Sequence, residues 1–460
     1  MKKLISVFVC ACLLMTMISA LSVSASTAPE DTKINKGVLL YYWHNDYAGS
    51  KYNTFSDDQL KQINEVTDEF IMIPIVNVNY YVDKSGKMQE IISLDDINSM
   101  TLDDIQWTSP YNLQKTKEEY TNLYNNMARQ KYTLNDYVDE TVKFAKRLVS
   151  ANPDVRLWFS VPATAMHALS DLQGPIWNEY VIDAFKDKVG SEIWDNNIQG
   201  IYFANEDAYP GFTKFDYDEP ENDFNNQVVM SMRDVSDKIH SYGKSMVWIP
   251  YCIETDSFGW EVYLRIAYIA NKTDIFDTIT IQPKIYFGQN TTDEIGFLKE
   301  SLDQQAFVDP DTGKIVGGTK SSSTSIGIEI ELDSSMADDT EYYDRFYEQF
   351  DFFKDYVGVT PFTFYAGTPQ SLMRINDHIA KFLANGSDNN NSSSNNPSSD
   401  SSVSQSTSDT STTSSNSANN SSAGSGIKNP ETGSSITMIA AVAALCSVSA
   451  VAIVASKKRR

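Results

Sequence analysis

Short apolar runs alternate along residues 36–385 with stretches in which apolar side chains recur every three or four positions. Short apolar runs predict buried strands, and the wider spacing predicts amphipathic helices. Eight strands are expected, at 37–42, 69–75, 155–161, 199–205, 245–251, 278–286, 325–332 and 361–366. Helical patterns lie between or beside them, at 57–66, 134–150, 179–189, 224–241, 260–270, 293–302, 341–356 and 368–383.

This order of elements predicts an α/β fold. Nearly continuous apolar strands separated by helices indicate a parallel sheet covered by helices, and eight such units indicate a (β/α)8 TIM barrel. A doubly wound sheet is the alternative, but no glycine-rich phosphate loop follows the first strand. The polar segment 77–132 is an insertion after the second strand, which we expect to shape a cleft on the catalytic face.

Segments outside this body have their own composition. Lys2 and Lys3 precede an apolar stretch and small residues at 23–25, so residues 1–25 are expected to be a secretory signal peptide. Residues 26–35 are interpreted as an N-terminal linker. Residues 386–428 are almost all Ser, Asn, Thr, Gly, Ala and Asp, which predicts a disordered linker that crosses the cell wall.

A three-part signal occupies residues 429–460. An apolar run at 436–455 is long enough to span a bilayer, and the basic end at 457–460 would stay in the cytoplasm. The motif before it consists of Asn429, Pro430, Glu431, Thr432 and Gly433. The whole signal resembles sortase signals of the LPxTG type, in an NPxTG variant. The resemblance implies that sortase cuts after Thr432 and joins it to peptidoglycan in a Gram-positive cell wall; a plain membrane anchor is the alternative.

The net charge limits the class of partner, and the cysteines limit the expected disulfides and nucleophiles. The formal charge is −24, and it becomes more negative once both basic ends are removed. That sign excludes nucleic acid as a partner and suits a neutral substrate. Cys10, Cys12 and Cys446 lie in the segments expected to be removed, so only Cys252 remains. We expect no disulfide, and we interpret Cys252 as a core residue rather than a nucleophile.

Acidic residues near two predicted strand ends are the candidate catalytic groups. Glu329, Glu331 and Asp333 alternate with apolar residues, which places the acids on one face, expected to be the barrel mouth. The alternative is a solvated edge strand. Glu206 follows Asn205 at the end of the strand at 199–205, where burial would raise the pKa of an acid; the alternative is an ordinary turn carboxylate. Two carboxylates that face one pocket are what glycoside hydrolysis requires.

These positions resemble the layout of the clan A retaining glycosidases. The resemblance implies that Glu206 is the acid/base, that Glu331 or Glu329 is the nucleophile, and that Asn205 binds the sugar 2-hydroxyl. It also matches Tyr286 to a tyrosine that touches the nucleophile. The runs 246–251, 282–287 and 327–331 together resemble the bacterial family called domain of unknown function 4855. That resemblance implies a secreted, glycosidase-like barrel and brings no established activity.

Aromatic and polar side chains near strand ends are candidate substrate contacts, because rings stack on the apolar faces of sugars. They are Trp43, His44, Trp248, Tyr251, Gln282, Asp333 and Tyr365. No cofactor or metal is expected, since the histidines are scattered and no metal or phosphate motif occurs; the acidic run at 309–314 is read as a turn. The sequence therefore predicts a wall-anchored hydrolase of a neutral poly- or oligosaccharide, with a non-catalytic glycan-binding adhesin as the alternative.

Overall fold

The computed structural model describes residues 28–43, 54–75, 80–82, 88–90, 94–99, 132–161, 179–204, 206, 217, 224–251 and 257–391. Several predictions fall outside these ranges. They are the signal peptide at 1–25, most of the insertion at 77–132, the linker from 392 onward, the sorting signal at 429–460, and the site candidates His44 and Asn205.

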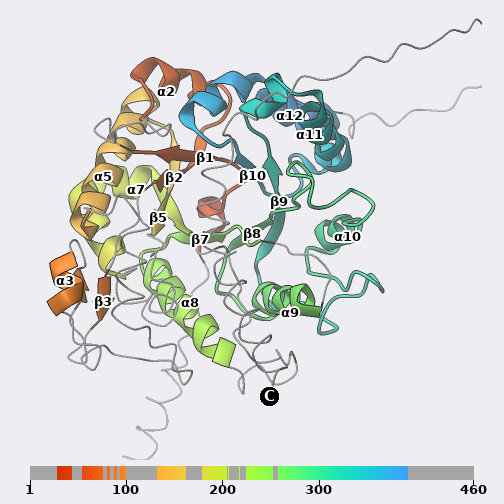
Figure 1. The fold of residues 1–460 in the computed structure, drawn as a ribbon, viewed down its shortest axis with the longest axis horizontal. Coiled ribbons are helices and arrows are strands. Elements are labelled where there is room, and N and C mark those ends of the chain that lie inside the picture. The colour runs from red at the N-terminus through yellow and green to blue at the C-terminus, as the bar shows by residue number, and fades with distance from the viewer. Residues whose placement is uncertain are drawn as a thin grey trace, which may run out of the picture. The chain divides into compact units, whose positions relative to one another are not determined.

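Eight parallel strands close into a barrel (Figure 1). Their order around the barrel is their order along the chain, and the last strand pairs with the first. The strands are β1 (Lys36–Tyr42), β2 (Glu69–Pro74), β5 (Arg156–Val161), β6 (Ile198–Phe203), β7 (Ser245–Trp248), β8 (Thr278–Ile281), β9 (Ser325–Glu331) and β10 (Phe362–Tyr365). The predicted (β/α)8 TIM barrel is confirmed, and the doubly wound sheet is wrong.

Helices surround the barrel on its outer side (Figure 1). They are α2 (Asp57–Asn64), α5 (Leu134–Ala151), a helix within 179–189, α7 (Ser191–Asn196), α8 (Phe224–His240), α9 (Ser257–Lys272), α10 (Phe297–Gln304), α11 (Thr340–Phe353) and α12 (Pro369–Asn391). Side chains set where two of them begin. Ser56 and Thr133 each form a capping box, with Gln59 and Asp136 respectively.

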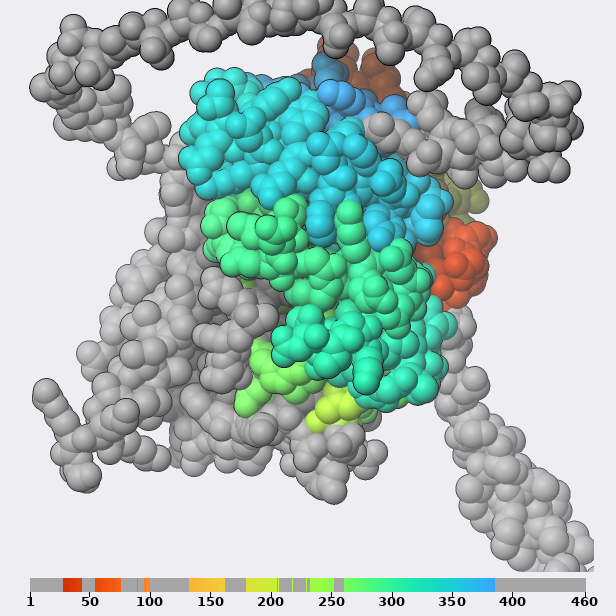
Figure 2. All heavy atoms as spheres, turned by 90° about the vertical axis from the view of Figure 1, so that its right-hand side faces the viewer, coloured from red at the N-terminus to blue at the C-terminus, as the bar shows by residue number. Residues whose placement is uncertain are grey.

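Smaller elements complete the described chain. The strands β3 (Tyr80–Val82) and β4 (Met88–Glu90) form an antiparallel pair, and α3 (Leu94–Ser99) follows them. Short 3-10 turns occupy Glu30–Thr32, Ser334–Ala337 and Lys354–Tyr356. Seen from the side of α10 and α11, the side chains of residues 290–360 cover that flank of the barrel (Figure 2). Within the described ranges, no helix has the length and apolar character that crossing a membrane needs.

Alternate residues of each strand face the barrel interior or the helices. Leu39, Ile71, Trp158 and Val247 belong to the inner cluster. The apolar residues of β9 belong instead to the outer cluster, between strands and helices. Glu329 and Glu331 therefore face inward, and they are only 3% and 1% exposed. β9 is paired on both sides, so the solvated edge strand is wrong.

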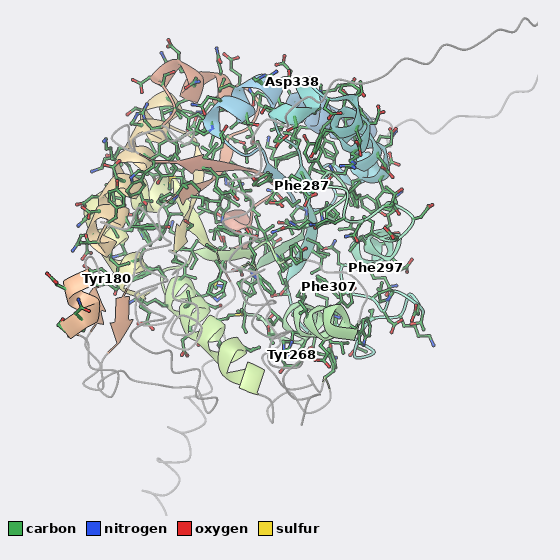
Figure 3. The ribbon with its side chains drawn as sticks, in the orientation of Figure 1. Tyr180, Tyr268, Phe287, Phe297, Phe307 and Asp338 are labelled. Atoms are coloured by element: carbon green, nitrogen blue, oxygen red, sulfur yellow. The ribbon has the colours of Figure 1, made fainter. Side chains whose placement is uncertain are left out.

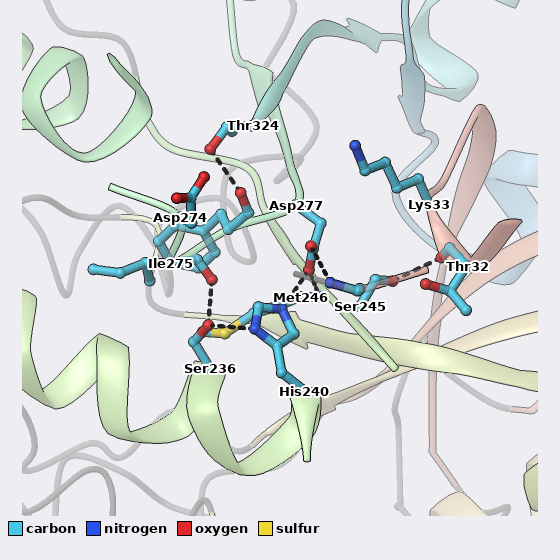
Figure 4. A network of polar contacts seen from close by, with 12 residues as sticks. Thr32, Lys33, Ser236, His240, Ser245, Met246, Asp274, Ile275, Asp277 and Thr324 are labelled. Carbon is cyan, nitrogen blue, oxygen red and sulfur yellow. Dashed lines mark hydrogen bonds and ion pairs between the residues drawn. The ribbon is translucent and has the colours of Figure 1, made fainter. Parts of the chain in front are cut away.

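The N-terminal segment 28–35 packs against the base of the barrel. Ile34 joins the inner cluster, and Ser245 Oγ donates to the Thr32 carbonyl at 2.7 Å (Figure 4). Asp277 accepts the backbone N–H of Ala28 at 3.2 Å. The strands begin at this end. In a TIM barrel that end contributes to stability, and the active site lies at the opposite end.

Candidate active site

Glu206 lies just beyond β6, and neighbouring strands hold its side chain. Tyr202 of β6 donates its hydroxyl to Glu206 Oε1 at 2.7 Å. Gln282, just after β8, donates its amide to Glu206 Oε2 at 2.8 Å and to the Ile249 carbonyl at 3.0 Å. The backbone N–H of Tyr251 donates to the Glu206 carbonyl at 2.9 Å. Both carboxylate oxygens of Glu206 thus accept a hydrogen bond.

Glu329 and Glu331 lie on adjacent inward positions of β9. Glu331 pairs with Tyr365 and Glu329 with Thr363, so Glu329 is one layer deeper than Glu331. Neither carboxylate oxygen of Glu331 has a hydrogen-bond partner in the part of the chain that the structure describes. A buried carboxylate without donors favours its protonated form, because nothing replaces the water it loses.

Burial raises the pKa of both acids. It raises the pKa of Glu331 to about 7, although the ammonium of Lys284 and two nearby backbone amides oppose the shift. It raises the pKa of Glu329 well above its usual range, and the charges of Glu206 and Glu331 add to that rise. Gln282 binds Glu206, and Lys284, two residues further on, lies 4.0 Å from Glu331. These contacts bring Glu206 and Glu331 to the same mouth of the barrel, with Glu329 one layer deeper.

Lys284 is a site residue that the sequence analysis missed. The strand expected at 278–286 ends at Ile281, and the chain turns at Lys284, which has a φ of +58°. Lys284 Nζ lies 4.0 Å from Glu331 Oε1 and 4.5 Å from the centre of the Tyr251 ring. A non-glycine residue in the left-handed region is uncommon and is found most often at functional sites. Pro283, which a central strand seldom contains, was the available signal.

Tyr286 and Asp333 contact one another. The Tyr286 hydroxyl donates to Asp333 Oδ1 at 2.7 Å and accepts the Asp333 backbone N–H at 3.2 Å. The same Asp333 oxygen accepts the Ser335 N–H and caps the 3-10 turn after β9. The resemblance implied that Tyr286 touches the nucleophile, but its hydroxyl binds Asp333. The hydroxyl of Tyr286 thus supports the end of β9 through Asp333, while its backbone amide is one of those that lower the pKa of Glu331.

Aromatic rings gather around the same mouth. Tyr365 packs edge-on against Tyr41, with ring centres 5.5 Å apart, and against Phe287 at 5.9 Å. Figure 3 shows Phe287 inside the ring of helices. Trp43 follows β1, is fully buried, and packs against Tyr132 at 4.9 Å. Tyr41, Trp43 and Tyr365 lie at or next to the ends of their strands, and Tyr132 and Phe287 pack against them.

Trp248 does not lie among the aromatic rings at the barrel mouth. It faces the helices, is fully buried, and stacks on Phe276 with ring centres 4.9 Å apart. Its neighbours Val247 and Ile249 take the inward positions of this segment. The proposal that Trp248 contacts substrate is therefore wrong, because the strand turns that position outward.

Among the described residues, no group of three His, Cys, Asp or Glu side chains is placed to hold a metal ion. Asp309 Oδ1 accepts the backbone N–H groups of Asp311 and Thr312 at 3.0 and 2.9 Å. The acidic run at 309–314 therefore closes a turn, as expected.

Comparison with known proteins leaves the family open. No protein-family model matches the chain, and no curated protein matches it. A candidate alpha-L-fucosidase from Bacteroides thetaiotaomicron has a TM-score of 0.35 at 12% identity, covering 77% of this chain and 95% of that one. A GH20 catalytic module of the pneumococcal exo-beta-D-N-acetylglucosaminidase StrH has a TM-score of 0.36 at 12% identity, covering 78% and 84%. The Bacillus megaterium spore cortex-lytic enzyme SleL has 0.33 at 11%, covering 75% and 74%. Each of these TM-scores is below 0.5.

Proposed function

We propose that this protein is a glycoside hydrolase that acts on a neutral poly- or oligosaccharide through two carboxylates. The observation that supports the proposal most is the meeting of Glu206 with Glu329 and Glu331 inside the barrel mouth. Like charges held together in a buried place cost stability, so a folded protein retains them most readily where they act. TIM-barrel active sites lie at this end of the strands.

The chemistry divides the work between two acids. One carboxyl protonates the oxygen that leaves the sugar, and the other carboxylate attacks the anomeric carbon or activates water. A retaining course is favoured here, since the positions of Glu206 and the β9 acids resemble the layout of the clan A retaining glycosidases. Tyr41, Tyr365 and Phe287 supply ring faces on which a sugar can stack.

The test is release of reducing sugar from plant, mucin and fungal glycans by the purified protein. Proton NMR of the first product then gives the anomer, which separates retention from inversion. We expect turnover of at least one neutral glycan with retained configuration. An inverted product would contradict the retaining course while leaving the two-carboxylate hydrolase intact.

A non-catalytic glycan-binding adhesin is the second candidate. The observation that favours it is the depth of the acids: Glu329 and Glu331 are 3% and 1% exposed, so a sugar reaches them only if covering residues move. Under this alternative, a glycan from the same panel would bind without turnover. Its affinity would then be unchanged by Glu206→Gln.

For its location, we propose secretion and covalent attachment to the cell wall of a Gram-positive bacterium. The support is the motif at 429–433, the apolar run and the basic end, which together resemble a sortase signal. Sortase and peptidoglycan would be the partners, through Thr432, and the membrane would be contacted only before sorting. Mass spectrometry of muramidase-released protein should find peptidoglycan on Thr432. A C-terminus that retains residues 434–460 in the membrane would favour the plain anchor.

A further inference from the structure

We propose that Glu331 donates the proton to the leaving group, that Lys284 is its positioning residue, and that Glu206 is the ionised carboxylate that attacks. This inference rests on the proposed hydrolase function. It reverses the roles of Glu206 and Glu331 implied by the resemblance to clan A glycosidases. It also gives a role to Lys284, which that resemblance does not include.

The contacts of Glu206 are those of an ionised carboxylate. Gln282 Nε2 can only donate, and it donates to Oε2 at 2.8 Å. Tyr202 donates to Oε1 at 2.7 Å, and burial followed by the Glu206 charge raises the pKa of Tyr202, so its hydroxyl keeps its proton. With a donor on each oxygen, the negative charge is stabilised where it forms. Such contacts favour the ionised form over the protonated form that a general acid needs.

Glu331 has the opposite surroundings. It is 1% exposed, and neither of its oxygens accepts a hydrogen bond from any residue that the structure describes. The Lys284 ammonium and the backbone amides of Lys284 and Tyr286 only partly offset the burial, so the protonated form is preferred. Its pKa of about 7 leaves it protonated in mildly acidic to neutral solution and still able to lose the proton. A general acid works best with a pKa near the working pH.

Lys284 helps Glu331 to release its proton. Its ammonium lies 4.0 Å from Glu331 Oε1, beyond hydrogen-bond distance but close enough to stabilise the anion left after transfer. The left-handed turn at Lys284 is fixed by the backbone N–H groups of Gln289 and Asn290, which donate to its carbonyl at 3.1 Å. The ring of Tyr251 lies 4.5 Å from Nζ and holds the ammonium from another side.

The bond between the anomeric carbon and the leaving oxygen breaks, and that oxygen takes the proton of Glu331. A Glu206 oxygen forms the new bond to the anomeric carbon, which gives a glycosyl ester. Water then attacks the same carbon and gives a proton back to Glu331, and Glu206 leaves as the free carboxylate.

Infrared titration of the protein tests the proton assignment without a substrate. We expect two buried carboxylic acid bands in the wild type, one from Glu331 that disappears near pH 7 and one from Glu329 that persists to higher pH; the band lost near pH 7 should remain in Glu206→Gln and be absent from Glu331→Gln. In Lys284→Met, the pH at which the Glu331 band disappears should rise by about one to three units, because the cation that stabilises the carboxylate is gone. In Lys284→Arg, which keeps a cation, that pH should return to the wild-type value. Lys299→Met is the matched control, since Lys299 of α10 lies over the ring of Phe352 of α11, outside the barrel. If the band that disappears near pH 7 is lost in Glu206→Gln and kept in Glu331→Gln, the assignment is overturned.

Aryl glycosides test the catalytic roles. Dinitrophenol leaves without an acid, so Glu331→Gln should keep most turnover of dinitrophenyl glycosides while losing at least about 100-fold on 4-methylumbelliferyl glycosides. Glu206→Gln should lose turnover of both kinds of aryl glycoside. The opposite pattern in the two variants would overturn this inference alone. A wild-type protein that cleaves neither the aryl glycosides nor any glycan would overturn the proposed function and this inference together.

Discussion

The side-chain amide of Gln349 forms two hydrogen bonds with the backbone of Glu331. Its oxygen accepts the Glu331 N–H at 3.2 Å, and its nitrogen donates to the Glu331 carbonyl at 2.8 Å. Gln349 is fully buried on α11. The helix thereby fixes the end of β9, from which the Glu331 carboxyl extends into the barrel mouth.

A matched pair of glutamines tests this positioning. Gln305 makes the same two bonds with Ile326 at the other end of β9, at 3.0 and 2.9 Å. Gln349→Ala and Gln305→Ala should each lower the free energy of unfolding by about 2–3 kcal/mol, because each leaves a strand N–H and C=O without partners. Only Gln349→Ala should lower kcat, since only its strand end carries Glu331. Urea unfolding and kcat at low temperature measure both effects, and an equal loss of kcat in both variants would contradict the positioning role.

The donors to Glu206 lead to a second prediction. Gln282→Ala and Tyr202→Phe each remove one hydrogen bond from the carboxylate. Hydrogen bonds to charged groups contribute about 1.5–3 kcal/mol, so kcat should fall roughly 10- to 100-fold in each variant. Steady-state kinetics on the glycan that the wild type cleaves provide the measurement. Unchanged kcat in both variants would mean that Glu206 does not act in the reaction.

The raised pKa of Glu331 makes a prediction for stability against pH. Burial holds this pKa near 7 in the folded chain, above its value of about 4.3 when unfolded. The folded state therefore binds more protons between these values, so stability falls as pH rises from about 4.5 to about 7, by up to about 3 kcal/mol.

Glu331→Gln removes this loss. The variant should be more stable than the wild type at pH 8 and similar to it at pH 4. Chemical unfolding at the two pH values provides the measurement. A variant that is less stable than the wild type at pH 8 would show that the ionised carboxylate is stabilised by contacts that this account lacks.

A fourth prediction concerns the base of the barrel. Asp277 accepts the Met246 N–H at 2.8 Å and contacts His240 Nε2 at 2.8 Å (Figure 4). It also holds Ala28 of the N-terminal segment. Asp277→Ala should lower the free energy of unfolding by about 3–5 kcal/mol, because it leaves several buried groups without partners. Activity at temperatures where the variant is folded should be unchanged, since the acids lie at the other end of the strands.

The fold was largely readable from the chain because buried strands have distinctive apolar runs. The acids on β9 also marked its inward face, since they alternate with apolar residues. On β7 both faces are apolar, so no alternation showed that Trp248 points toward the helices. The face of a strand can be read from sequence only where one face is polar.

Lys284 was harder to find for a different reason. Its position depends on where β8 ends, and an apolar run does not show its own last paired residue. The sequence placed 284 inside a strand, and the structure places it in a left-handed turn. The contact between Lys284 and Glu331 also joins the loop after β8 to the far end of the neighbouring strand β9, and residues so far apart in sequence meet only in the folded sheet.

The central claim is that Glu206 and Glu331 together hydrolyse a glycosidic bond. The most direct measurement compares reducing-sugar release by the wild type, Glu206→Gln and Glu331→Gln, each shown by circular dichroism to be folded. Both substitutions keep the shape of the side chain and remove only its acid chemistry. The account predicts that wild-type turnover of a neutral glycan is lost in Glu206→Gln and falls at least about 100-fold in Glu331→Gln. Full turnover in either variant, or glycan binding without any turnover in the wild type, would contradict it.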